Sequence, residues 1–183
     1  ICFVPDGDYA RVITKLRPYA VQPGNVVHLD GRVLGKHEGI INFTIGQRRG
    51  LGVATGEPVY VISLNPATCE VVVGPHEALA TREIRLKNLN WIGPLPSNAE
   101  GMDVFAKIRS TRPAAPATIH LDKDHPDQAR VVMHVDDFGV SPGQACVLYE
   151  GAHSGARVFG GGWIYSTARE PSRTQSKTTL YRA

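Results

Sequence analysis

Beyond residue 20 the sequence breaks into short apolar runs separated by turn-forming residues, a pattern that leaves little room for helices. The runs 26–29 and 32–34 flank Asp30-Gly31, a dipeptide typical of two-residue β-hairpin turns. The runs 60–64 and 70–74 predict a second hairpin, because Asn and Pro lie between them. One more strand is expected over 81–86 before the pattern changes.

The one expected helix spans residues 6–20. Asp6 or Asp8 can cap its start, apolar residues recur at helical spacing up to Leu16, and Pro18 ends it.

A second group of short runs follows a loop-like, proline-containing segment, and we expect a domain boundary between about residues 86 and 100. Turns recur there about every eight to twelve residues, which is typical of a small barrel or sandwich. The expected strands are 103–109, 114–121, 129–134, 144–150 and 156–165. The prediction is a mainly β protein: a small β-rich domain with one N-terminal helix over 1–86, a β-barrel over 87–168, and a polar, basic tail over 169–183 that we expect to be disordered.

Composition narrows the class of protein. The chain has 183 residues, 42% of them hydrophobic and 20% charged, which is typical of a globular protein. The net charge is +3, so a nucleic-acid-binding face must be a local patch. No apolar run approaches the roughly 18 residues of a membrane span, and we expect no signal peptide. We expect a soluble, cytoplasmic protein without a membrane partner.

The cysteines lie at positions 2, 69 and 146 and show no CxxC spacing, so neither a zinc site nor a disulfide framework is indicated. Cys69 and Cys146 lie in strand-like runs and are interpreted as small buried hydrophobic residues. The histidines have no metal-ligand spacing, and no bound metal is expected. The first residue is Ile, and we interpret the chain as a fragment of a longer protein.

Residues 35–52 combine five glycines with basic and amide side chains. The glycines allow tight turns or the close approach of a ligand. Lys36, His37, Gln47, Arg48 and Arg49 place cationic and amide donors beside those turns, and such donors suit phosphates and base edges. A glycine-rich hairpin with a solvated basic tip explains the same residues, so both interpretations stay open.

Three stretches resemble, in the same order, the bacterial tRNA-specific 2-thiouridylases. Residues 35–52 (GKHEGIINFTIGQRRGLG), with 58–61 after them, resemble the central segment of that family. Residues 1–9 (ICFVPDGDY) resemble the segment that carries its second catalytic cysteine. Residues 140–149 and 160–164 resemble its C-terminal β-domain. Together the resemblance spans about residues 1–166.

The resemblance implies a fragment of a tRNA-uridine 2-sulfurtransferase that thiolates the wobble uridine at position 34. It implies a central domain and a C-terminal barrel that follow a nucleotide-binding domain absent from this sequence, and ATP bound by that absent domain. Cys2 falls on the cysteine that carries sulfur as a persulfide. A sulfur-relay protein or a cysteine desulfurase would load it, and a second cysteine in the absent domain would form a disulfide with it. The fragment alone is expected to be inactive.

The resemblance also places contacts to tRNA, the expected partner. Family members usually show Arg-Tyr-Arg-Gln where this chain has Arg109-Ser110-Thr111-Arg112, so a stacking aromatic and one guanidinium are missing. Residues 107, 109 and 111 are expected to share one strand face. The predicted tRNA-binding residues are Lys107, Arg109, Ser110, Gln144, Gln47, Arg48 and Arg49.

Two other functions remain open on the sequence. A β-barrel RNA-binding module without catalysis would need only basic strands and phosphate contacts. A structural β-domain with solvated basic hairpins would need neither. A reactive Cys2 separates the enzyme from the module, and salt-dependent tRNA binding separates the module from the structural domain.

Overall fold

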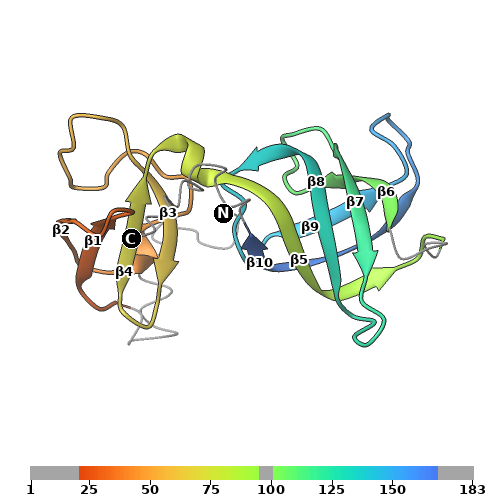
Figure 1. Cartoon of the computed structure of the whole chain (residues 1–183), viewed down its shortest axis with the longest axis horizontal. Helices are drawn as coiled ribbons and strands as arrows, with labels where there is room; N and C mark the ends of the chain where they lie inside the picture. The colour runs from red at the N-terminus through yellow and green to blue at the C-terminus, as the bar shows by residue number, and fades with distance from the viewer. Residues whose placement is uncertain (1–20, 95–100, 169–183) are drawn as a thin grey trace, which may run out of the picture. The chain divides into compact units, whose positions relative to one another are not determined.

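The computed structural model describes residues 21–94 and 101–168, which form two compact units (Figure 1). The sheet unit holds the described residues up to Ala80 together with Asp137–Val140, and the barrel unit holds the remainder. The mainly β fold class and the β-barrel predicted from the sequence are confirmed. The expected helix over 6–20 and the tail over 169–183 lie outside the described residues. No helix among the described residues has the length and apolar character of a membrane span.

The sheet unit is built on four strands in the order β2-β1-β4-β3. The β1/β4 pair is parallel and the outer pairs are antiparallel. Two short 3-10 turns, η2 (Ile40–Asn42) and η3 (His76–Leu79), accompany the sheet. The strands are β1 (Gly24–His28), β2 (Val33–His37), β3 (Tyr60–Asn65) and β4 (Glu70–Gly74), and their core is Val26, Leu51, Val61, Val71 and Val73.

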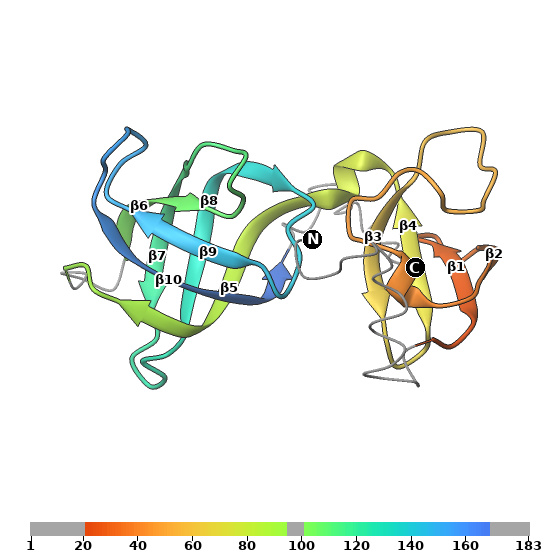
Figure 2. The same cartoon turned by 180° about the vertical axis from the view of Figure 1, so that it is seen from behind.

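The barrel unit closes six strands in the order β10-β5-β8-β7-β6-β9 (Figure 2). Successive side chains alternate between the inside and the outside of the barrel, as in any strand. Ile84 and Leu86 of β5, for example, are completely buried, whereas Arg85 and Lys87 are exposed. The strands are β5 (Ala80–Trp91), β6 (Met102–Lys107), β7 (Ala115–Leu121), β8 (Ala129–Phe138), β9 (Ala145–Tyr149) and β10 (Val158–Ala168).

Strand β5 joins two segments that the sequence pattern separates. The two units divide between Ala80 and Thr81, while the boundary suggested at 86/87 falls within β5. Asn88 adopts a positive φ of 50°. The pairing of β5 with β10 is irregular at this point, because Gly161 pairs with Asn90 and Trp163 with Lys87. This bulge breaks the alternation of side chains, so the sequence suggests two strands where the fold has one.

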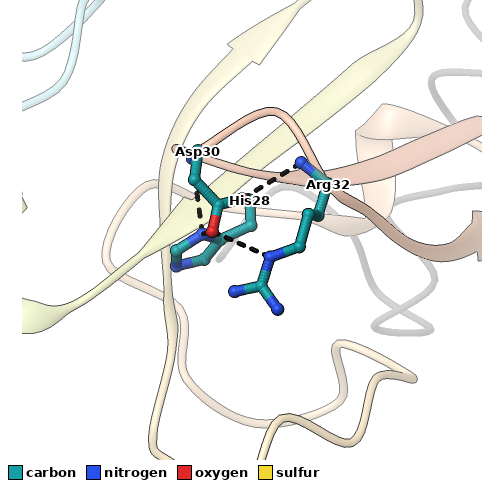
Figure 3. Close-up of polar contacts among 3 residues, drawn as sticks. All are labelled: His28, Asp30 and Arg32. Atoms are coloured by element: carbon teal, nitrogen blue, oxygen red, sulfur yellow. Dashed lines mark hydrogen bonds and ion pairs between the residues drawn. The ribbon is translucent and has the colours of Figure 1, made fainter.

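Asp30 organises the predicted hairpin between β1 and β2 (Figure 3). Its Oδ1 accepts the Arg32 amide at 3.0 Å, and its Oδ2 lies 2.8 Å from Arg32 Nε and 2.9 Å from His28 Nδ1. The Arg32 amide is the main reason why the pKa of Asp30 is lowered from 3.8 to about 2. Gly31 has a φ of 92°, a conformation that glycine adopts readily. The connection covers residues 29–32, two more than the expected two-residue turn.

Candidate nucleic-acid interface

The residues predicted to contact RNA fall into two groups, one in each unit. The loop group lies between η2 and β3 of the sheet unit, and the barrel group lies at the ends of β6 and β9. The loop group is Gln47, Arg48 and Arg49; the barrel group is Lys107, Arg109, Ser110 and Gln144.

The Gln47 side chain is engaged within its own loop. Its Oε1 accepts the Thr44 amide at 3.0 Å, and its Nε2 donates to the Arg49 carbonyl at 2.9 Å. The main chain is also tied to β3, because the Gly46 amide donates to the Val61 carbonyl and the Val61 amide donates to the Gln47 carbonyl. With both ends of its amide engaged, Gln47 holds the loop that presents the two arginines. Its contact with RNA stays a prediction.

Arg48 and Arg49 are exposed at this turn. Gly46 and Gly50, with φ values of 87° and 72°, let the chain turn on either side of them. Neither guanidinium forms a hydrogen bond or ion pair within residues 21–94 and 101–168. Arg48 lines a shallow pocket of about 480 Å³ formed with residues of the loop 50–59. Because both guanidiniums are solvated and the loop is fixed by its hydrogen bonds, they can bind phosphate oxygens without first breaking an ion pair.

In the barrel group, Lys107 ends β6 and pairs with Val147 of β9. Arg109 and Ser110 follow in the connection to β7, where the Arg112 amide donates to the Arg109 carbonyl at 3.3 Å. The expectation that residues 107, 109 and 111 share one strand face is therefore wrong beyond Lys107. The chain turns at 110–112 and then meets Pro113, which has no amide hydrogen for a strand ladder. Lys107 lines a pocket of about 260 Å³.

Gln144 closes the turn that leads into β9. Its Oε1 accepts the Ser141 amide at 3.0 Å, and its main-chain carbonyl accepts the Ile164 amide at 2.8 Å. Its Nε2 has no hydrogen bond among the described residues and can donate to a phosphate or base. Since Lys107 pairs with Val147, three residues from Gln144, the barrel group lies at the adjacent ends of two neighbouring strands, β6 and β9.

His37 is not a surface donor, which corrects its sequence-based interpretation. The ring is buried, at 7% exposure, and it packs edge-on against Phe43 with centroids 5.2 Å apart. Nδ1 accepts the Gly39 amide at 3.0 Å, so Nε2 carries the ring proton and donates to the Cys69 carbonyl at 3.1 Å. His37 therefore ties β2 to the turn before β4.

The cysteines have three different outcomes. Cys2, the predicted persulfide carrier, lies outside the described residues. Cys146 is completely buried in the barrel, as predicted. Cys69 is half-buried in the β3–β4 turn with a positive φ of 55°, so its interpretation as a buried strand residue is wrong. The hairpin needs a left-handed residue there before β4 begins. Among the residues that the structure describes, no cluster of three His, Cys, Asp or Glu side chains could hold a metal ion.

The sequence patterns missed one exposed aromatic pair. Trp163 and Tyr165 of β10 are 51% and 38% exposed, while Ile164 between them is 1% exposed. All three residues are apolar enough to be assigned to a core, so composition alone does not distinguish the two exposed rings from the buried Ile164. The alternation along a barrel strand is the signal that could have found it.

Comparison with known proteins agrees with this architecture. A family model for the tRNA methyl transferase PRC-barrel domain matches residues 15–75, and one for the aminomethyltransferase β-barrel domain matches residues 81–164. The proteins named tRNA-specific 2-thiouridylase MnmA from Brucella ovis, Brucella canis and Brucella suis are each 51% identical over 175 residues. These matches cover 93% of this chain and 43% of each relative. The chain thus spans less than half the length of these curated relatives. By these matches the chain belongs to the family of the tRNA-specific 2-thiouridylases.

Proposed function

We propose that this chain is the tRNA-contacting part of an enzyme that replaces the C2 oxygen of the wobble uridine with sulfur. The observation that carries the proposal is the 51% identity over 93% of the chain to proteins named tRNA-specific 2-thiouridylase. The geometry supports it, because the loop group and the barrel group offer cations and amides suited to a phosphate backbone.

In this proposal Cys2 carries the sulfur as a persulfide, loaded by a sulfur-relay protein or a cysteine desulfurase. A persulfide is more acidic than a thiol, so more of it is the anionic nucleophile at neutral pH. Its outer sulfur bonds to C2 of uridine 34, and the C2 oxygen, activated by ATP as the resemblance implies, leaves with AMP. A second cysteine thiolate then attacks the Cys2 sulfur and breaks the persulfide S–S bond, which leaves the outer sulfur on C2 and forms a disulfide with Cys2. Cys146 does not suit this second role, since its side chain is completely buried.

The resemblance also implies activation of the uridine by ATP. The described residues do not fit that nucleotide, because the glycine-rich loop leads into strand β3, whereas phosphate-binding loops open into a helix. We therefore assign no step of the activation to this part of the chain.

Replacement of Cys2 tests the catalytic half of the proposal. In the protein that carries this sequence, Cys2→Ser should abolish 2-thiouridine formation, measured by mass spectrometry of nucleosides, and leave tRNA affinity unchanged. The matched control, Cys69→Ser, should keep the activity. Thiolation that survives Cys2→Ser would refute the assigned role. A wild-type protein that binds tRNA and never thiolates it would favour the non-catalytic RNA-binding module.

Replacement of Arg109 tests the binding half. If this guanidinium contacts phosphate or base, Arg109→Ala should weaken tRNA binding by roughly 1–3 kcal/mol. The slope of log affinity against log salt should also become shallower by about one phosphate contact. Filter binding across a salt series measures both quantities. Arg32→Ala serves as the control, because that guanidinium already pairs with Asp30. Equal affinity of both variants would remove Arg109 from the interface.

A further inference from the structure

Strand β10 presents two aromatic side chains on the outside of the barrel. Trp163 is 51% exposed and Tyr165 is 38% exposed, and they are the large aromatic residues exposed to this degree in the described parts of the chain. Ile164 between them points into the barrel at 1% exposure. Both exposed rings therefore lie on one outer face, where they leave apolar surface in water that a ligand could cover.

The neighbours of Trp163 leave its ring accessible. In the strand registers Trp163 lies opposite Ala145 of β9 and opposite Lys87 of β5. Figure 2 shows β9 and β10 side by side in this part of the barrel. Gly161, two residues earlier on β10, cannot gain a side chain, since a Cβ there would lie 2.6 Å from the Cys146 carbonyl oxygen. The Trp163 ring thus has small residues, Ala145 and Gly161, and one cation, Lys87, as its neighbours in the sheet.

The charges along this face favour an anion. Lys87 is exposed and forms no ion pair among the described residues. Glu83 lies 3.1 Å from Arg85 Nε and 3.4 Å from Arg130 Nη1, so one carboxylate serves two guanidiniums and a positive charge is left over. Arg85, Arg130 and Tyr165 line a pocket of about 260 Å³ together with Asp122, whose carboxylate is bonded to the amides of Asp124 and His125 and offsets that charge. The net positive charge of the face therefore comes from Lys87.

We propose that Trp163 and Tyr165, with Lys87 and Arg85 beside them, form a stacking site for unpaired nucleotides of RNA. The site rests on the proposed function, because it extends the surface through which this chain would hold tRNA. Aromatic rings take the faces of unstacked bases, and nearby cations meet the linking phosphates. The face adjoins the barrel group, because Trp163 pairs with Ala145 and Ala145 follows Gln144 directly. Trp163 could thus supply the aromatic ring that Ser110 does not.

Fluorescence can report the stacking directly. The chain has two tryptophans. The other, Trp91, is not part of the proposed site, and its Nε1 donates to the Pro94 carbonyl. In a Trp91→Phe background Trp163 is the sole indole. A single-stranded oligouridylate should then quench its emission, whereas an RNA duplex with the same number of phosphates should not, because its bases are already stacked.

Binding of tRNA to the full chain gives the second measurement. Trp163→Ala should weaken the affinity roughly five- to hundredfold, and Trp163→Phe should retain most of it. Lys87→Gln should make the salt dependence shallower, and Lys123→Gln, at the tip of the β7–β8 hairpin, should not. Ile92→Ala is the control for lost apolar surface, because Ile92 is 61% exposed.

Three results would overturn the site. Equal quenching by oligouridylate and duplex would show attraction to phosphates alone. A Trp163→Ala chain that binds tRNA as tightly as the wild type would remove the ring from the interface. A blue shift of Trp163 emission that grows with protein concentration and without RNA would assign the face to a second copy of the chain. If the wild type has no affinity for tRNA, the proposed function fails, while the oligouridylate titration still decides whether this site exists.

Discussion

Polar side chains around the glycine-rich segment divide into those that build the loop and those that remain available. His37 uses both ring nitrogens inside the sheet unit, and Gln47 uses both ends of its amide. Arg48 and Arg49, next in the sequence, stay solvated. The same residue types that suggest a ligand site therefore serve partly as its framework, whereas Arg48 and Arg49, like the exposed Lys36, form no hydrogen bond or ion pair among the described residues and keep their donors for an anion.

The Asp30 carboxylate should make the β1–β2 hairpin sensitive to acid. Its pKa is lowered to about 2 in the folded chain from 3.8, so its charged form stabilises the fold above pH 3.8. That contribution is lost as the pH falls from 3.8 towards 2. Asp30→Asn should unfold at lower urea concentration than the wild type at neutral pH. The difference should vanish near pH 2. A difference that persists there would mean that the charge is not the cause.

At the level of elements, strand β1 is fixed by how closely it approaches the turn before β4. A Cβ on Gly24 would lie 1.7 Å from the Cys69 carbonyl oxygen, the same oxygen that accepts from His37. The absence of a side chain at Gly24 therefore permits both the parallel β1/β4 pairing and the histidine bond.

Gly24→Ala should accordingly destabilise the sheet unit by about 3 kcal/mol or more, since backbone must move to admit the methyl group. Gly56→Ala is the matched control: its Cβ would meet nothing, and its φ of 73° costs about 1 kcal/mol. Urea unfolding of both variants measures the two values. Equal losses of unfolding free energy in the two variants would show that the backbone at Gly24 shifts at little cost.

Most strands could be predicted from the sequence because each alternates side chains between two environments. The expected runs 60–64 and 70–74 nearly coincide with β3 and β4. The failures come from effects between strands, which a linear pattern does not contain. Asn88 bulges β5 without ending it, and Cys69 lies in a turn with a left-handed backbone and is only half-buried. The candidate site follows the same rule: residue types indicated cations, but pairing across strands revealed Trp163 beside Lys87.

At the level of the whole molecule, the two units do not correspond to two halves of the sequence. Asp137–Val140 belongs to the sheet unit although it comprises the last two residues of β8, a barrel strand, and the two residues after them. Phe138 stacks on His76 with centroids 4.7 Å apart, and His76 contacts Tyr60 of β3 edge-on at 5.2 Å. The Gly139 amide also donates to the Leu79 carbonyl.

Phe138→Ala should therefore weaken the sheet unit, by about 1 kcal/mol or more, although the residue ends the barrel strand β8. Faster amide exchange at Val61 and Val71 would report the loss. Both tryptophans lie in the barrel unit, so their unfolding transition should stay unchanged. Val135→Ala, at a half-exposed position of β8, should change neither the amide exchange at Val61 and Val71 nor the tryptophan unfolding transition. A shifted tryptophan transition in Phe138→Ala would assign the segment to the barrel instead.

Strand β10 pairs with both β5 and β9, so the barrel closes on the last described strand of the chain. During synthesis the ribosome must deliver residues 158–168 before the ring of hydrogen bonds can close. Until then β5 and β9 are open edges, ready to pair with another nascent chain. A premature stop that removes this strand would leave an open sheet, with aggregation as its expected fate.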